Sequence, residues 1–292
     1  MKKITTAVLP VAGMGSRFLP VTKSSPKEML PIIDKPLIQY IVDEAVASGI
    51  KQLVLVTSYT KRAIEDYFDS NFELETRLHE RGKHELLDCI RKLLPDDVRV
   101  VYVRQSTPKG LGDAVLCAEQ VVGDNPFAVL LADDIIDSAT PCLAGMMDQY
   151  YQTRGSVLAV ESVEPDFIHQ YGVVKLGQNG SGIDAIVEKP ERHLAPSNLG
   201  VIGRYVLSPK IFSYLKAIPA GVGGGIQLTD AIACLLSEEN VTAYKFAGTR
   251  FDCGSKSGFL EATLAYAAKR SSMRPVLDKF TRNYIESMSV TS

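Results

Sequence analysis

Apolar-rich runs of strand length recur in the first half of the chain. They cover residues 4–9, 53–56, 98–103 and 127–131. The runs 53–56 and 127–131 have no polar residue, which is typical of parallel strands that are covered on both faces. Between the first two runs, apolar residues recur with helical spacing from Leu37 to Val46, after Pro36 and before Gly49, which suit a helix start and end. The pattern strand, helix, strand predicts an α/β fold.

The second half has a different pattern. Short strand candidates at 156–163, 172–176, 183–187 and 201–207 are separated by Gly, Asn, Pro and Ser, which favours a more antiparallel section. Helices are predicted at 212–218, 228–236 and 259–268, with a further strand at 241–246. At 292 residues the chain is long enough for two domains, but α/β folds often run this long as one. We expect one dominant domain with insertions.

Two segments lie outside this regular alternation. Residues 73–94 have helical periodicity and a dense mixture of charges, and a solvated helical insertion is the favoured interpretation because charge runs are normally solvated faces. A lid or a subunit contact is the alternative for this insertion. Residues 271–292 have weak periodicity and are interpreted as a C-terminal tail or an oligomer arm.

Composition narrows the function classes. A formal net charge of −2 provides no broad basic field for nucleic acid, so any anion binding must be local. The five cysteines are scattered without a C-x-x-C pair, which indicates reduced thiols in a cytoplasmic protein. The four histidines have no metal-ligand spacing, and no segment has membrane-spanning length or the form of a signal peptide.

A glycine-rich basic loop follows the first apolar run. Gly13 and Gly15 would let backbone N–H groups approach an anion, and Arg17 and Lys27 add positive charge. The dinucleotide fingerprint fails because Phe18 stands where a third Gly or Ala is needed, and no Gly-Lys-Ser/Thr completes a P-loop. A phosphate cradle is therefore weighed against a tight turn that only closes a strand.

Further polar groups follow later strands. Gln105 and Asp133 come at the ends of two apolar runs, the loop Gly110-Leu111-Gly112 opens a helix, and Asp252 precedes the last helix. In open α/β sheets, ligands bind in the crevice at the carboxyl ends of the strands. We expect these residues to converge there, together with the Glu188-Lys189 pair.

These motifs carry a family resemblance over about residues 4–269. The matching blocks are Ala12-Gly13-Met14-Gly15-Ser16-Arg17, Pro26-Lys27-Glu28-Met29-Leu30-Pro31, Val103-Arg104-Gln105, Gly110-Leu111-Gly112, Val187-Glu188-Lys189-Pro190, Gly203-Arg204-Tyr205, Ile226-Gln227-Leu228-Thr229-Asp230 and Phe251-Asp252-Cys253-Gly254. In this order they closely resemble the bacterial UTP–glucose-1-phosphate uridylyltransferases, a nucleotidyltransferase family. Eight ordered motifs are far more specific than any one of them.

The resemblance implies a fold and a reaction. The fold is a Rossmann-like, mixed and mostly parallel central sheet flanked by helices, of the nucleotide-diphospho-sugar transferase type, with a smaller sugar-side β section. It implies a single nucleotidyltransferase domain over 1–270, with a nucleotide-binding part over about 1–150 and a sugar-binding part over about 151–270. The reaction is the transfer of the uridylyl group of UTP to glucose 1-phosphate. Because the second pKa of a phosphate monoester is about 6, the attacking group needs no general base.

The resemblance also implies residue roles. The nucleotide would be bound by Ala12, Gly13, Gly15, Ser16, Arg17, Lys27, Gln105, Gly112 and Asp133, and the sugar phosphate by Gly172, Glu188, Lys189 and Val201. Arg17, Lys27 and Lys189 would be catalytic, and Asp133 with Asp252 would hold Mg²⁺, a hard ion that suits carboxylates. Gln105, Gly112 and the backbone of Ala12-Gly13 would read the uracil edge. Homodimers or homotetramers are common in this family, and no nucleic acid or membrane partner is implied.

Several alternatives are compatible with these motifs. A glucose-1-phosphate thymidylyltransferase or a non-catalytic regulatory homologue would share much of the pattern. For Asp134, beside Asp133, a helix cap or a supporting partner is the favoured interpretation, and a metal ligand is the alternative. The chain departs from the family pattern where Asp113 replaces a common His and Gly225 replaces a common Glu, which could change rate or sugar selectivity.

Overall fold

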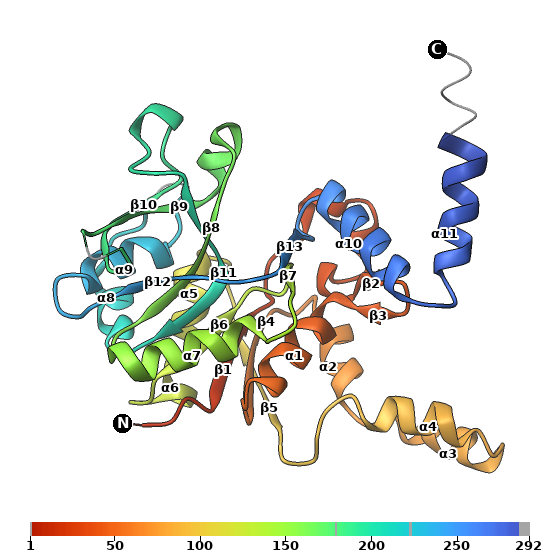
Figure 1. Cartoon of the computed structure of the whole chain (residues 1–292). Helices are drawn as coiled ribbons and strands as arrows, with labels where there is room; N and C mark the ends of the chain where they lie inside the picture. Colours follow the sequence, from red (N-terminus) through yellow and green to blue (C-terminus); the bar gives the residue numbers. More distant parts are fainter. Residues whose placement is uncertain (1, 179, 222–223, 286–292) are drawn as a thin grey trace.

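A computed structural model describes residues 2–178, 180–221 and 224–285, and a nine-stranded sheet forms its centre. The strands are β1 (Thr6–Pro10), β4 (Gln52–Thr57), β5 (Arg99–Arg104), β6 (Phe127–Leu130), β8 (Val157–Ser162), β9 (Gly172–Leu176), β10 (Ile183–Glu188), β11 (Leu199–Leu207) and β12 (Thr242–Lys245). Their order is β10-β9-β11-β6-β1-β4-β5, and β8 and β12 continue from β11. Figure 1 displays this arrangement.

The sheet has two parts that differ in strand direction. β6, β1, β4 and β5, which the apolar runs predicted, are parallel to one another. From β11 onward the pairs of β11 with β6, β8 and β9, and of β10 with β9, are antiparallel, while β12 is parallel to β8. The mixed α/β fold is therefore confirmed, and the antiparallel section falls where the Gly- and Pro-separated strands predicted it. Through the β6–β11 pair, one sheet spans both parts.

Helices cover both faces of the sheet, as the double-sided apolar runs require. They are α1 (Leu37–Ala47), α5 (Leu111–Cys117), α6 (Glu119–Val122), α7 (Cys142–Thr153), α8 (Ile211–Ala217), α9 (Leu228–Leu235) and α10 (Lys256–Lys269). Alternate residues of β1 serve the two faces: Ala7 and Leu9 pack in one core with α1, α7 and α10, and Val8 packs in the other with α5, α8 and α9. Both cores are fully shielded from solvent at these positions.

A small second sheet brings distant segments together at the edge of the main sheet. β7 (Asp134–Asp137) pairs antiparallel with β13 (Thr249–Asp252), and in this register Asp252 lies opposite Asp134. A further short pair joins β2 (Pro31–Ile32) to β3 (Lys35–Pro36). Sequence patterns did not predict β7 or β13, because four residues carry too little periodicity. Their pairing places Asp252 beside the turn that carries Asp133.

Two helical segments project from the body (Figure 1). After α2 (Arg62–Phe68), the charged insertion forms α3 (Phe72–Glu80) and α4 (His84–Arg91), separated at Gly82, which has a φ of 64°. The predicted helical insertion is confirmed, with this break. α11 (Arg274–Phe280) and a π-helical turn, Thr281–Ile285, extend beyond α10. The remainder of the predicted tail, 286–292, lies outside the described residues. Within the described part, no helix is long and apolar enough to cross a membrane.

Candidate active site

The glycine-rich loop leaves β1 at the carboxyl edge of the parallel strands. Gly15 has a φ of 66°, and a Cβ on it would lie 3.2 Å from both Lys27 Cβ and Thr22 Cγ2. Both facts favour glycine at this position. The Thr22 hydroxyl donates to the Gly15 carbonyl at 2.8 Å, and a 3₁₀ turn, Ser16–Phe18, follows. The loop is thus held in a shape that lets its backbone approach Lys27 closely.

A cavity of about 230 Å³ lies against this loop. It is lined by Gly15, Ser16, Arg17, Lys27, Asp133 and Gly254, together with Phe18. Arg17 Nη1 donates to the Gly254 carbonyl at 3.4 Å, and Phe18 contacts Phe259 of α10 edge to face. Five of its seven lining residues are sequence-predicted nucleotide ligands. The cavity therefore combines two cationic side chains with one carboxylate, a setting suited to phosphates and a metal ion.

Lys27 and Asp133 form an ion pair inside this cavity. Lys27 Nζ lies 2.5 Å from Asp133 Oδ2, and each side chain is only about a quarter exposed or less. Burial lowers the pKa of Lys27, but the Asp133 and Glu28 carboxylates outweigh it and hold that pKa above its ordinary value. Burial raises the pKa of Asp133, but Lys27 outweighs this and holds it below its ordinary value. Both groups are therefore charged at neutral pH.

A second ion pair fixes the turn that carries Lys27. Glu28, the next residue of the 3₁₀ turn Lys27–Met29, accepts from Lys61 Nζ at 2.8 Å, and both side chains are almost fully buried. Because neighbouring residues of the turn point apart, Glu28 anchors the interior while Lys27 faces the cavity. Sequence analysis missed Lys61, whose position just before a charged helix resembled an ordinary solvated cation.

The turn between β6 and β7 presents Asp133, and β13 brings Asp252 to it. The Cys253 backbone N–H donates to the Asp133 carbonyl at 2.8 Å. A Cβ on Gly254 would lie 2.8 Å from Asp133 Oδ2 and 3.0 Å from Asp252 Oδ1, so both carboxylates border the same small space. Among the described residues, no cluster of three or more His, Cys, Asp or Glu side chains could hold a metal. Any cation here would need substrate or water oxygens as further ligands.

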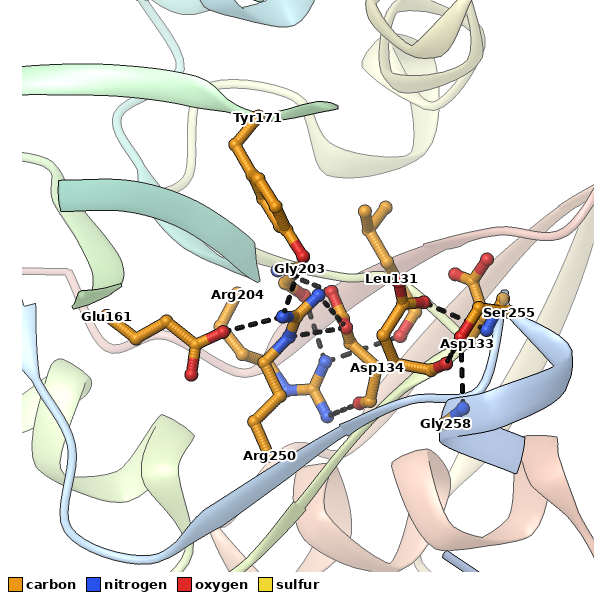
Figure 2. A network of polar contacts seen from close by, with 12 residues as sticks. Leu131, Asp133, Asp134, Glu161, Tyr171, Gly203, Arg204, Arg250, Ser255 and Gly258 are labelled. Atoms are coloured by element: carbon orange, nitrogen blue, oxygen red, sulfur yellow. Dashed lines mark hydrogen bonds and ion pairs between the residues drawn. The ribbon is translucent and has the colours of Figure 1, made fainter. Parts of the chain in front are cut away.

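Arg204 supports the Asp133 turn from within the core. It is fully buried on β11 and pairs with Glu44 of α1 at 2.7 Å. Its guanidinium also donates to the carbonyls of Leu131, Gly203 and Asp134, at 3.3, 2.9 and 2.7 Å (Figure 2). A planar group with five donors is thus fully used. Arg204 is therefore a structural residue, and through Leu131 and Asp134 it holds the chain on either side of Asp133.

Arg250 of β13 supports the same turn from the cavity side. Its guanidinium contacts Asp134, Glu161 and the Tyr171 hydroxyl, at 2.6, 2.6 and 3.2 Å (Figure 2). Burial lowers the pKa of Arg250, but the Asp134 carboxylate outweighs it, so that pKa is raised and the side chain stays charged. Asp134 is thus a supporting partner, as its position suggested. Arg250 itself was missed, although it stands just before the recognised Phe251-Asp252-Cys253-Gly254 block.

A larger cavity of about 430 Å³ adjoins the first. All four residues predicted for the sugar phosphate line it: Gly172, Glu188, Lys189 and Val201. Arg17 and Asp133 line both cavities, so the two are contiguous at these side chains. Lys189 has a φ of 44°, a backbone strain that is uncommon for a residue with a side chain and is concentrated at functional sites. Its Nζ lies 3.2 Å from Glu188 Oε1.

The predicted base-reading residues lie at the same sheet edge but line neither cavity. Gln105 follows β5, and its backbone N–H donates to Thr57, the last residue of β4, at 2.9 Å. The Gly112 N–H donates to the Ile226 carbonyl at 2.9 Å, so this donor is already used within the fold. Ala12 is buried, and a Cβ on Gly13 would meet no atom within 4 Å. The loop beside Gly13 is therefore open.

Comparisons with known proteins agree with this geometry. Residues 6–269 match the family described as nucleotidyl transferase. The UTP–glucose-1-phosphate uridylyltransferase of Bacillus subtilis (strain 168) is 49% identical over 285 residues, covering 96% of this chain and 97% of that protein. A UTP-bound UGPase from Acinetobacter baumannii superposes with a TM-score of 0.89 at 45% identity, covering 96% of this chain and 99% of that one. A UDP-glucose pyrophosphorylase complexed with UDP-glucose superposes with a TM-score of 0.83 at 43% identity, covering 91% and 100%.

Proposed function

Because this chain belongs to the nucleotidyl transferase family, we propose that it is an enzyme that transfers the uridylyl group of UTP to glucose 1-phosphate. The products are UDP-glucose and pyrophosphate. The observation that carries the proposal is the junction of two cavities at Arg17 and Asp133, one lined by the glycine-rich loop and one by the Glu188-Lys189 segment. Two anionic substrates would meet at this junction.

The reaction needs positioning and charge neutralisation more than proton transfer. A phosphate oxygen of glucose 1-phosphate attacks the α-phosphorus of UTP, and the bond to the bridging oxygen of the departing pyrophosphate breaks. The nucleophile is already mostly deprotonated near neutral pH because its second pKa is about 6. In this account Lys27 contacts the α-phosphate, while Arg17 and the backbone of 13–16 hold the β- and γ-phosphates. Bringing the two reactants into line supplies much of the acceleration.

The sugar side supplies orientation. Glu188 would accept hydrogen bonds from glucose hydroxyls, and Lys189 would hold the sugar phosphate. A Cβ on Gly172 would lie 3.0 Å from Thr229 Oγ1 and 3.5 Å from Glu188 Oε2, so glycine leaves room beside the carboxylate. Val201, which is nearly buried on β11, closes this wall with its backbone and small side chain.

We assign Mg²⁺ to the space between Asp133 and Asp252. The absence of a Cβ at Gly254 keeps that space open between two carboxylate oxygens, which are the ligands this hard ion prefers. When bound, Mg²⁺ would neutralise phosphate charge as a Lewis acid. In the structure Lys27 pairs with Asp133. If Asp133 binds the cation, the Lys27 ammonium would be released to contact a phosphate of the nucleotide. Asp252→Asn tests the assignment: turnover is expected to fall by at least about 10²-fold.

Two alternatives are less well supported. A thymidylyltransferase would share the loop, the Glu188-Lys189 segment and the metal aspartates, but the charged insertion at 73–94 and the Ile226–Asp230 block favour the uridylyl type. A regulatory homologue would have lost phosphate or metal groups, whereas Arg17 and Lys27 are present and face the cavity.

Assembly and location are further parts of the proposal. Leu260 and Leu264 of α10 and Val276 and Phe280 of α11 are 42–64% exposed, which supports a homodimer or homotetramer formed through this arm. Light scattering on the full chain would measure the mass directly. All five cysteines are free, which supports a cytoplasmic location.

The direct experiment is an assay of the purified chain with UTP, glucose 1-phosphate and MgCl₂. Pyrophosphate release is followed by a coupled assay, and UDP-glucose is identified by mass spectrometry. Each substrate is omitted in turn as a control. Release that depends on both substrates supports the proposal, whereas no turnover with this pair contradicts it.

A further inference from the structure

The side-chain amide of Gln105 is held by two acceptors. Its Nε2 donates to Asp113 Oδ2 at 2.7 Å and to the Gly110 carbonyl at 3.2 Å. Asp113 lies in the first turn of α5, and Gly110, with a φ of 98°, immediately precedes that helix. Both hydrogens of the amide are therefore used by the loop and helix that follow Gln105.

These two partners fix which way the amide faces. A backbone carbonyl has no hydrogen to donate and neither does an ionised carboxylate, so the nitrogen, and not the oxygen, must face them. The opposite atom, Gln105 Oε1, accepts no hydrogen bond from any residue that the structure describes. Among the described residues, only Glu28 Oε1 and Gln39 Oε1 are fully buried side-chain atoms without a hydrogen-bond partner. Gln105 Oε1 is therefore partly exposed to solvent. Gln105 thus presents an acceptor at the carboxyl edge of the sheet.

Pyrimidine bases differ at the atom that such an acceptor would contact. Uracil and thymine carry a donor at N3, whereas cytosine carries a lone pair there. We propose that Asp113 is a positioning residue that locks the Gln105 oxygen toward the base, so that the site selects a pyrimidine with an N3–H group over cytosine. This inference rests on the proposed function, in which Gln105 reads the base.

The selection follows from the cost of turning the amide over. Cytosine N3 would need the amide nitrogen, and turning Gln105 would set its oxygen against the Asp113 carboxylate and the Gly110 carbonyl. Two acceptors facing each other leave both unsatisfied in a largely buried place, and the charge of Asp113 increases the penalty. Gln105 is only 6% exposed, so water compensates little. A carboxylate in the first turn of a helix also stabilises that helix, but this effect alone does not depend on the base.

The test compares nucleotide binding, without sugar phosphate, by isothermal titration calorimetry. Parent chain, Asp113→Ala, Asp113→Asn and the control Glu119→Ala are titrated with UTP, dTTP and CTP. Glu119 also carries a negative charge on the next helix, but it pairs with Lys216 and does not contact Gln105. We expect the preference for UTP over CTP to fall by at least about tenfold in both Asp113 variants, as loss of one charge-assisted hydrogen bond implies. The ratio of UTP to dTTP should stay within about twofold, because both bases carry N3–H.

Three results would overturn the inference. The first is a ratio of UTP to CTP affinity that is unchanged in both Asp113 variants. The second is a parent chain that binds UTP no tighter than CTP. The third is a UTP-to-CTP affinity ratio that Asp113→Ala lowers by the same factor in a Gln105→Ala background as in the parent chain. In the last case Asp113 would not act through Gln105. The titrations contain no sugar phosphate, so they measure nucleotide binding and not turnover. Absence of turnover in the separate activity assay would contradict the proposed function without deciding the role of Asp113. The nearly isosteric Asp113→Asn keeps the test available if Asp113→Ala unfolds.

Discussion

Arg250 places two donors on one carboxylate oxygen of Asp134. Nε lies 2.7 Å and Nη2 2.6 Å from Asp134 Oδ1, while Asp134 Oδ2 accepts from the Gly203 N–H at 2.9 Å. Both Asp134 oxygens are therefore occupied by the fold. Its neighbour Asp133 instead faces the cavity and Lys27. Adjacent aspartates of one turn thus have different surroundings: Asp134 is bound by the fold on both oxygens, and Asp133 lines the cavity beside Lys27.

Asp134→Ala is expected to destabilise the fold. The change leaves the Arg250 charge and the Gly203 N–H without this partner in a site where both ion-pair side chains are less than a tenth exposed. Breaking a buried pair from one side costs about 3–5 kcal/mol. Urea unfolding measures it, with Asp97→Ala as control, since the Lys51–Asp97 pair is exposed. Equal unfolding free energies for the two variants would contradict the assigned role.

Gly254→Ala is expected to weaken Mg²⁺ use without unfolding the chain. The new methyl group would lie 3.0 Å or less from oxygens of Asp133 and Asp252, so at least one carboxylate must move. The atoms nearest to the new methyl group are side-chain ends that can shift, and the backbone φ of Gly254 is one that alanine can adopt. The Mg²⁺ concentration for half-maximal rate should rise by at least about tenfold, as expected for a displaced ligand. An unchanged Mg²⁺ titration would place the cation elsewhere.

Cys253 gives a pH dependence of stability with a definite sign. Burial, with Asp134, Asp252 and Asp133 nearby, raises the pKa of its thiol to about 12. An ordinary thiol titrates at about 8.5, so above that pH the unfolded chain has lost a proton that the native chain retains. Stability should therefore fall as pH rises through this window, by at most about 1.4 kcal/mol per pH unit from this group.

Denaturant unfolding between pH 9 and 11 measures this contribution. Cys253→Ala should have a shallower decline than the parent chain, whatever its stability at neutral pH. Cys234→Ala, at an exposed position, should decline as the parent does. Identical slopes for the two variants would show that the Cys253 thiol does not titrate differently in the native state. The same burial predicts that Cys253 resists alkylation in the native protein at neutral pH.

Periodicity alone predicted the main sheet because its strands and helices are long enough to repeat. β4, β5 and β6 each carry four consecutive apolar residues and β1 carries three, and the alternate residues of β1 pack into different cores. β7 and β13 could not be predicted in this way. They are four-residue strands with mixed polarity, and what defines them is their pairing across more than a hundred residues of sequence.

The residues of the candidate site differ in the same way in how far the sequence predicts them. Gly15, Arg17 and Lys27 were predictable because they form a local motif after a strand, and the structure gathers them around one cavity. Arg250, Lys61 and Glu44 were not, because their importance lies in long-range ion pairs with Asp134, Glu28 and Arg204. A single charged residue on a strand or before a helix carries no signal of its partner.

Competition between UTP and dTTP for glucose 1-phosphate tests the central claim most directly. The purified chain is supplied with both nucleotides at equal concentration, limiting glucose 1-phosphate and MgCl₂, and the two sugar nucleotides are quantified by mass spectrometry at low conversion. The product ratio then equals the ratio of kcat/KM values. We predict that UDP-glucose predominates. Equal or greater formation of dTDP-glucose, or no sugar nucleotide at all, would contradict the assignment.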